Sequence, residues 1–228
     1  STWDIYCKNV ANNGRRMKIL NLYACLGGNR YKWDEVTDIE VTAVELDSEL
    51  ARLYQERFPN DKVIVADAHQ YLLDHYKEYD FIWSSPPCPS HSRARFWNTK
   101  AHRIYPDLKL YEEILFLQTH FKCKFCIENV QPYYTPLIPG NKIGRHLFWT
   151  NFNLPNNLNE RKSSIMKGKN EVVNWSKFHQ YDFTKYKGKQ RTDKIARNLV
   201  DYEAGKTILE TVAGIARKQN INQLEMFN

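Results

Sequence analysis

Apolar runs of strand length alternate with helical stretches along the first half of this chain, and this arrangement limits the choice of fold most. Strands are predicted at 18–23, 41–46, 63–66, 79–83 and 125–127. Strands that alternate with helices are typical of a doubly wound, mostly parallel sheet. We therefore predict an α/β fold of this kind, in one domain of ordinary size.

Helices are predicted between these strands and near the end of the chain. The first begins with Ser48 as its N-cap and stops near 58–60. Further helices are predicted through 71–73, over 110–119 and over 204–217, the last because its apolar residues recur at helical spacing.

Residues 154–194 break the alternation, because they are polar, basic and weakly periodic. They follow a strand predicted at 147–152 and are interpreted as a small basic insertion. The predicted organisation is an N-terminal extension over 1–16, a main domain over 17–153 and 195–228, and the insertion over 154–194.

Positive charge is concentrated near this insertion. The chain has a net charge of +7, and residues 154–197 hold eleven Lys and Arg against four Asp and Glu, which is also +7. Basic residues mixed with aromatic ones suit phosphate contact and base stacking, so nucleic acid is a predicted partner; a solvated, lysine-rich surface is the alternative. The basic candidates are Lys177, Lys185, Lys187, Lys189 and Arg191, and the aromatic ones are Trp175, Phe178, Tyr181, Phe183 and Tyr186.

Composition argues against a membrane, secreted or metal protein. No apolar run approaches the ~20 residues that cross a bilayer, and the N-terminus lacks the layout of a signal peptide. The five cysteines are an odd number, so we expect them to be reduced in a cytoplasmic protein. Cys123 and Cys126 have the spacing of half a zinc site, but no second pair accompanies them, so no metal is expected.

The residues that follow the first three strands indicate a nucleoside cofactor. The turn 23–28 is glycine-rich, and glycines let a ligand approach the backbone closely. Glu45, at the end of the second strand, is placed to accept hydrogen bonds from ribose hydroxyls, and Asp67 could accept one from an adenine amino group. The chain has no Gly-x-x-x-x-Gly-Lys phosphate loop, which argues against an ATPase.

Pro86-Pro87-Cys88 follows the fourth strand. Two prolines stop a strand, and the carboxyl ends of parallel strands are where α/β sheets bind ligands. Arg93 would favour a thiolate, and Glu128-Asn129 ends the neighbouring fifth strand. A thiol and a carboxylate placed in this way predict an enzyme with a cysteine nucleophile; a buried structural cysteine is the alternative. His91 could be its base, although a turn histidine is the simpler interpretation.

Pro86-Pro87-Cys88 with Ser92, followed by Glu128-Asn129-Val130, resembles the DNA cytosine-5 methyltransferases, most closely their small phage and prophage members. The turn 23–28 is similar to the family's Phe-Ala-Gly-x-Gly-Gly element, with Cys25 in place of a glycine. These ordered motifs are specific when they occur together.

Two later segments extend the resemblance. Residues 144–148 resemble the family's arginine-containing strand, which supports the target cytosine, and 197–200 resemble its C-terminal element beside the cofactor. Residues 154–194 take the place of the target-recognition domain and are much shorter, so the resemblance implies a reduced recognition region there.

The resemblance implies a Rossmann-like methyltransferase fold, S-adenosylmethionine as cofactor and double-stranded DNA as partner of a monomer or weak dimer. It implies catalytic roles for Cys88, Glu128, Asn129 and Arg145, and nucleic-acid contacts for Ser92 and Arg93. The implied cofactor-binding residues are Tyr23, Ala24, Cys25, Leu26, Gly27, Gly28, Glu45, Leu46, Asp67, Ala68, Pro87, Leu110, Asn198 and Leu199.

The chemistry fits these residues. A thiolate that adds to cytosine C6 makes C5 able to attack a sulfonium methyl group, while a carboxyl at N3 stabilises the developing charge. The base must leave the stack first. Two alternatives stay open: the same reaction on RNA or a free cytosine nucleotide, and a non-catalytic nucleic-acid-binding protein that retains the fold.

Overall fold

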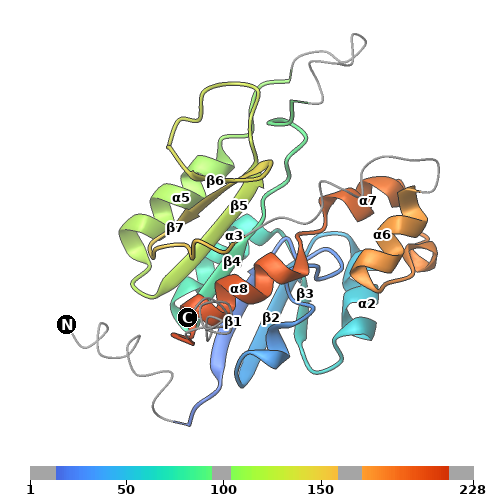
Figure 1. The fold of residues 1–228 in the computed structure, drawn as a ribbon, viewed down its shortest axis with the longest axis horizontal. Coiled ribbons are helices and arrows are strands. Elements are labelled where there is room, and N and C mark those ends of the chain that lie inside the picture. Colours follow the sequence, from blue (N-terminus) through green and yellow to red (C-terminus); the bar gives the residue numbers. More distant parts are fainter. Residues whose placement is uncertain (1–13, 94–103, 159–170, 216–228) are drawn as a thin grey trace, which may run out of the picture.

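The computed structural model describes residues 14–93, 104–158 and 171–215. Their strands form one seven-stranded sheet in the order β3-β2-β1-β4-β5-β7-β6 (Figure 1). β1 to β5 are parallel, whereas β7 is antiparallel to β5 and β6. The predicted doubly wound, mostly parallel sheet is confirmed. The strands are β1 Met17–Leu22, β2 Ile39–Glu45, β3 Lys62–Val65, β4 Phe81–Ser84, β5 Lys124–Val130, β6 Asn141–Ile143 and β7 His146–Thr150.

The chain changes direction across the sheet after β3. It builds β2 and β3 on one side of β1 and then crosses back to place β4 and β5 on the other side. The carboxyl ends of β1 and β4 therefore border the crevice at which open α/β sheets bind ligands.

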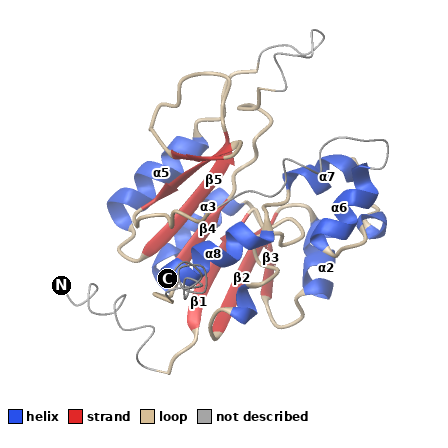
Figure 2. Ribbon diagram, viewed as in Figure 1, coloured by secondary structure: helices blue, strands red, loops and turns tan. Residues whose placement is uncertain are grey.

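Helices cover both faces of the sheet (Figure 2). α3 and α5 pack against Leu20 and Leu22 of β1, whereas α8 packs against Ile19 on the opposite face. Both faces of β1 are therefore buried, which explains why the apolar residues Ile19 and Leu20 are adjacent in its sequence. The α-helices are α2 Ser48–Arg57, α3 Ala68–His75, α5 Lys109–His120, α6 Glu171–His179, α7 Thr192–Asn198 and α8 Tyr202–Val212, and the 3₁₀ turns are η1 Trp33–Glu35, η2 Tyr76–Glu78 and η4 Phe183–Lys185.

Two predicted helix boundaries are wrong. The N-cap of α2 is Asp47 rather than Ser48, because Asp47 Oδ1 accepts hydrogen bonds from the backbone N–H groups of Glu49 and Leu50, at 3.0 and 3.2 Å. α8 ends at Val212, short of the predicted end, because Gly214 takes the left-handed conformation, with φ of +71°, that stops a helix.

The described part of the predicted insertion includes three helical elements between residues 171 and 194: α6, η4 and the start of α7. Trp175, Phe183 and Tyr186 are buried together with Leu50 and Leu53 of α2. The prediction that these three aromatic rings stack on bases is therefore wrong, because they form a small core that fixes the segment to α2 (Figure 1). We call residues 171–198 the α6–α7 segment.

Arg57, the last residue of α2, strengthens this attachment. Its guanidinium donates to the backbone oxygens of Leu26 and His179, both at 2.9 Å, and lies over the rings of Tyr31 and Tyr181. One side chain thus joins the turn after β1, α2 and the end of α6.

None of the helices in the described ranges combines the length and apolar character that crossing a bilayer requires. Cys25, Cys88 and Cys126 are free thiols, whereas Cys123 is disulfide-bonded, so the expectation of fully reduced cysteines is wrong at Cys123. Because Cys126 is free and buried, Cys123 and Cys126 do not pair with each other. Burial raises the pKa of the Cys126 thiol, which favours an inert, protonated side chain.

Candidate active site

A cavity of about 1250 Å³ opens at the carboxyl ends of β1, β2, β4 and β5. It brings together residues from the turn after β1, the loop after β4, the end of β5 and the start of β7. The predicted site residues that line it are Tyr23, Ala24, Cys25, Gly28, Glu45, Leu46, Asp67, Ala68, Pro87, Cys88, Ser92, Arg93, Glu128, Asn129, Arg145, Lys189, Asn198 and Leu199.

Three residues predicted to bind the cofactor do not line the cavity. Leu26 and Leu110 are buried in apolar clusters. Gly27 has a φ of +69°, and a Cβ there would lie 2.4 Å from a ring carbon of Phe58. These three residues therefore shape the walls of the cavity through packing.

Four of the predicted nucleic-acid contacts lie outside the cavity as well: Lys177, Lys185, Lys187 and Arg191. Lys185 pairs with Glu56 at 2.9 Å, and Arg191 pairs with Asp193 at the same distance. Part of the positive charge of this region is thus neutralised by neighbouring carboxylates.

Glu45 joins the ends of β1 and β2. Its Oε2 accepts the backbone N–H of Cys25 at 2.8 Å, and its Oε1 accepts that of Asp47 at 2.9 Å. Burial raises the pKa of this carboxyl group. Cys25 has a φ of +50°, which explains why glycine would suit this position.

The cavity has a surface suited to a nucleoside beside Glu45. The side chain of Leu46 is 69 % exposed although it lines the cavity, so an apolar surface faces empty space there. Asp67 also lines the cavity and is the N-cap of α3, with Oδ1 accepting the backbone N–H of Gln70 at 2.8 Å. An apolar surface and two carboxylates in one cavity suit the flat base and the hydroxyl groups of an adenosine.

Glu113 is a site residue that sequence reasoning missed. Its carboxylate is fully buried and accepts hydrogen bonds from Tyr23 Oη at 2.6 Å, Ser84 Oγ at 2.7 Å and His69 Nδ1 at 3.1 Å. It thereby joins the ends of β1 and β4 to the start of α3. Its hydrogen bond raises the pKa of His69, and burial together with its charge raises that of Tyr23. One feature of the sequence could have identified Glu113: it lies between Leu110 and Leu117 on the apolar face of α5.

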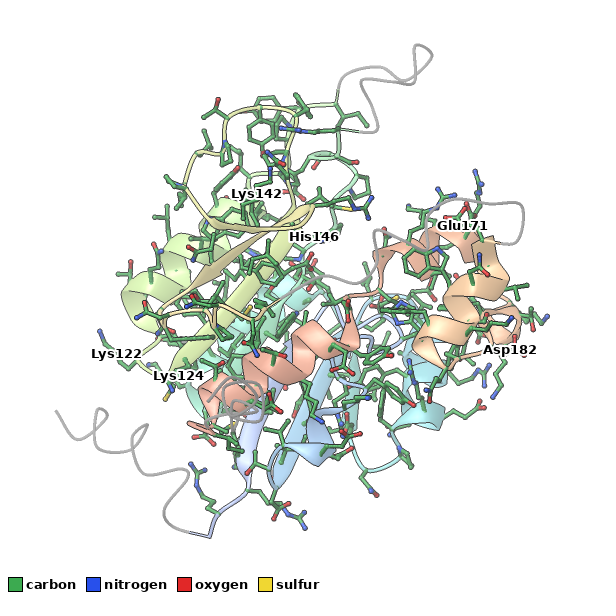
Figure 3. The ribbon with its side chains drawn as sticks, viewed as in Figure 1. Lys122, Lys124, Lys142, His146, Glu171 and Asp182 are labelled. Carbon is green, nitrogen blue, oxygen red and sulfur yellow. The ribbon has the colours of Figure 1, made fainter. Side chains whose placement is uncertain are left out.

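Glu128 is held from two sides. Ser85 Oγ donates to Glu128 Oε2 at 2.9 Å and accepts from Trp83 Nε1 at 2.9 Å. His146 Nε2 lies 3.3 Å from Glu128 Oε1. His146, labelled in Figure 3, is a second residue that sequence reasoning missed, because the motif at 144–148 assigns a role to the neighbouring Arg145 alone.

Arg145 lies in the two-residue turn between β6 and β7. Gly144 before it has a φ of +56°, as tight hairpins require, and the Arg145 carbonyl accepts the backbone N–H of Gln131 at 2.8 Å. Its exposed side chain lines the cavity. The hairpin therefore carries Arg145 to the mouth of the cavity and directs His146 toward Glu128.

The loop that carries Cys88 is fixed at both ends. Asn129 Nδ2 donates to the carbonyl of Pro86 at 2.9 Å, and Arg93 Nε donates to that of Pro132 at 3.1 Å. Between them the carbonyl of Cys88 accepts the backbone N–H groups of His91 and Ser92, both at 3.0 Å. The half-buried thiol thus sits on a defined turn at the end of β4.

The side chain of His91 stabilises this loop. Its side chain is buried, its Nδ1 lies 2.6 Å from Tyr134 Oη, and burial lowers its pKa. The interpretation of His91 as a turn histidine fits this position. In the described ranges, no three His, Cys, Asp or Glu side chains are grouped as a metal ion would require.

Comparison with known proteins gives the following similarities. No curated protein matches the chain significantly. Spodoptera frugiperda DNMT2 is 28 % identical with a TM-score of 0.38, and the match covers 50 % of this chain and 35 % of that one. A SAM-dependent methyltransferase from Agrobacterium tumefaciens is 17 % identical with a TM-score of 0.39, with 59 % and 45 % covered. The chain thus spans less than half the length of either protein.

A family model gives the decisive match. The model of the C-5 cytosine-specific DNA methylases matches residues 17–135, which is more than half of the chain. This range contains the glycine-rich turn, both acidic strand ends, the Cys88 loop and Glu128. The resemblance inferred from the motifs is confirmed, and the chain belongs to the C-5 cytosine-specific DNA methylase family.

Proposed function

We propose that this chain transfers a methyl group from S-adenosylmethionine to C5 of cytosine in DNA, through a covalent adduct with Cys88. The observation that supports this most is a single cavity lined by Cys88, Glu128 and the turn after β1. It offers a nucleophile, an acid and a nucleoside-shaped wall within one space. S-adenosylmethionine is the cofactor of this family, and when bound it supplies a methyl group on a positively charged sulfur.

We assign the cofactor to the side of the cavity formed by β1, β2 and the start of α3. Leu46 would lie against the adenine, Glu45 would accept from the ribose and Asp67 from the adenine amino group. Asn198 and Leu199 would close this side, because they approach from the end of α7. The apolar exposure of Leu46 in the cavity supports this assignment.

The base would enter from the side of the Cys88 loop. The thiolate forms a bond to C6, and the electron pair of the C5=C6 bond moves toward C5 and N3. Glu128 gives its proton to N3, so the developing negative charge is neutralised. C5 then takes the methyl group, a base removes the C5 proton, and the thiolate leaves as Glu128 regains its proton.

The charge around the cavity supports a nucleic acid as the partner. Arg93, Lys109 and Arg145 line it on one side, and Lys189 and Lys194 on the other. Cations on both sides of a base-sized opening suit the phosphates that flank an extruded nucleotide. We propose that the α6–α7 segment contributes phosphate contacts through Lys189 and Lys194, in a recognition region reduced to a wall of the catalytic domain.

The test is transfer of a tritiated methyl group from S-adenosylmethionine to unmodified duplex DNA, compared with tRNA and dCMP. We expect transfer to DNA, 5-methylcytosine as the product, and at least a 10³-fold loss in Cys88→Ser, because the nucleophile is removed. Cys126→Ser is the matched control, since Cys126 is a buried free thiol outside the cavity. Transfer only to tRNA or dCMP would replace DNA as the substrate, and full activity of Cys88→Ser would overturn the mechanism.

A further inference from the structure

We propose that Asp47 is a positioning residue that presents Lys189 to the DNA backbone, through a clamp formed with Tyr186 and Gln190. The inference rests on the proposed function, because it concerns how the α6–α7 segment makes one of its phosphate contacts. A lysine side chain is long and flexible, so ordering it on binding costs conformational entropy. A backbone that already holds the lysine at the cavity reduces this cost.

Asp47 is itself fixed by the end of β2 and the start of α2. Its backbone N–H donates to Glu45 Oε1 at 2.9 Å, and its Oδ1 accepts the backbone N–H groups of Glu49 and Leu50. These contacts leave the second oxygen, Oδ2, for the α6–α7 segment, which packs against α2 (Figure 1). One side chain thus connects a wall of the cavity to a segment distant in sequence.

Asp47 Oδ2 closes the base of a short turn in that segment. It accepts hydrogen bonds from Tyr186 Oη at 2.8 Å and from Gln190 Nε2 at 2.9 Å. The backbone N–H of Gln190 also donates to Tyr186 Oη, at 3.2 Å. We call Asp47, Tyr186 and Gln190 the Asp47 clamp. The clamp holds both ends of the turn 187–189 at one carboxylate oxygen.

Packing fixes one end of the turn, and a glycine sets its path. The Tyr186 ring is buried with Leu50 and Leu53 of α2, so its hydroxyl group is held beside Asp47. A Cβ on Gly188 would overlap that hydroxyl group, so the turn passes directly over it. The turn therefore has little freedom while the clamp is closed.

The clamp gives the two lysines of the turn different positions. Lys187 and Lys189 are both exposed, but of the two only Lys189 lines the cavity. Among the residues that the structure describes, no carboxylate pairs with Lys189, whereas Lys185 pairs with Glu56 at 2.9 Å. The charge of Lys189 is thus available to a phosphate. Without the clamp, Lys189 would lie on an unrestrained turn and would have to be ordered when DNA binds.

The carboxylate of the clamp is charged. Burial alone would raise the pKa of Asp47, but the hydrogen bonds from Gln190, Tyr186 and the start of α2 lower it below its usual value. Asp47 is therefore ionised at neutral pH. Hydrogen bonds to an ionised acceptor are stronger than those between neutral groups, which favours the closed clamp.

The experiment measures the salt dependence of duplex DNA binding in Gln190→Ala and Tyr186→Phe, by fluorescence anisotropy of a labelled duplex between about 50 and 200 mM salt. Neither substitution removes a charge, and Tyr186→Phe keeps the ring in the core. We nevertheless expect each to reduce the magnitude of the slope of log K against log salt concentration by about 0.9, as Lys189→Gln does, because Lys189 no longer meets its phosphate. Adding Lys189→Gln to Gln190→Ala should cause no further reduction, because both changes remove the same contact.

Gln70→Ala is the matched control. Gln70 also donates to an aspartate, with Nε2 at 3.1 Å from both carboxylate oxygens of Asp74, but it lies on α3 outside the cavity. Its slope should equal that of the wild type. The Kd for S-adenosylhomocysteine should stay within about twofold of wild type in every variant, because the Asp47 backbone still holds Glu45.

A wild-type slope in Gln190→Ala and Tyr186→Phe would overturn the clamp and leave the proposed function intact. Additive slope changes in the double variant, or an equal change in Gln70→Ala, would overturn it as well. Absence of both duplex binding and methyl transfer in the wild-type protein, assayed alongside, would contradict the proposed function itself, and the clamp with it.

Discussion

The most informative single residue after Cys88 is Glu113, which the motifs do not include. A fully buried carboxylate is unfavourable unless its oxygens are satisfied, and here three side chains donate to it. The donors come from three elements: the end of β1, the start of α3 and the end of β4. Glu113 therefore holds Tyr23 and His69, which line the cavity, in place and anchors Ser84 directly before the loop of Cys88.

Glu113→Gln should weaken cofactor binding more than chemistry. The amide removes the charge that attracts three donors, so we expect a KM for S-adenosylmethionine about tenfold higher, or ~1.4 kcal/mol, with kcat within about threefold. The free energy of unfolding should fall by about 2 kcal/mol, as for hydrogen bonds to a charged group. Initial-rate kinetics measures KM and kcat, and urea unfolding measures the free energy of unfolding.

Glu112→Gln is the control for this variant, because the neighbouring Glu112 is 63 % exposed and meets His69 only at 3.4 Å. It should leave KM and stability close to wild type. Equal effects of the two substitutions would contradict a specific role for Glu113.

At the scale of elements, β1 to β5 and α8 were predictable from the sequence, whereas α6, α7 and β6 were not. β1 to β5 lie within two residues of their predicted positions at most ends, because most of their buried residues are apolar. α6 was missed because its packing relies on Trp175 and on α2, a partner distant in sequence. β6 was missed because three mostly exposed residues at a sheet edge carry no apolar signal.

The turn after β1 shows how elements remote in sequence form one site. A Cβ on Gly28 would lie 2.5 Å from the backbone oxygen of Val200 and 3.0 Å from the Cβ of Leu199. The chain between α7 and α8 therefore rests directly on this turn. Gly28 matters because it lets Asn198 and Leu199 reach the cavity, in addition to leaving room for a ligand.

Gly28→Ala should loosen that contact. The added methyl group clashes with backbone, which cannot rotate away, so we expect the free energy of unfolding to fall by about 1–3 kcal/mol. Cofactor affinity should fall as well, because Asn198 and Leu199 move. Gly214→Ala is the control, because it introduces backbone strain without a steric clash. Gly214 has a φ of +71° and open space around it. If Gly214→Ala lowered cofactor affinity as much, the contact with residues 199–200 would not be the cause.

At the scale of the whole molecule, the position of a cation decides its role more than the net charge of +7. The basic region identified from composition divides into two groups in space. Lys189 and Lys194 line the cavity, whereas Lys185 and Arg191 pair with carboxylates outside it. Composition located the basic region, but only the fold, through the packing of the α6–α7 segment on α2, separates the two groups.

This division predicts how DNA binding depends on salt. A lysine that neutralises a phosphate releases counterions, and its loss lowers the slope of log K against log salt concentration by about 0.9. We expect Lys189→Gln and Lys194→Gln each to lower the slope by about this amount and to weaken binding to all duplex sequences alike. Lys185→Gln should leave the slope unchanged, because its charge is already paired with Glu56. Fluorescence anisotropy of a labelled duplex between about 50 and 200 mM salt measures the slopes. Equal slope changes in all three variants would mean that the basic region attracts DNA through its total charge. The assignment of phosphate contacts to the cavity rim would then be wrong.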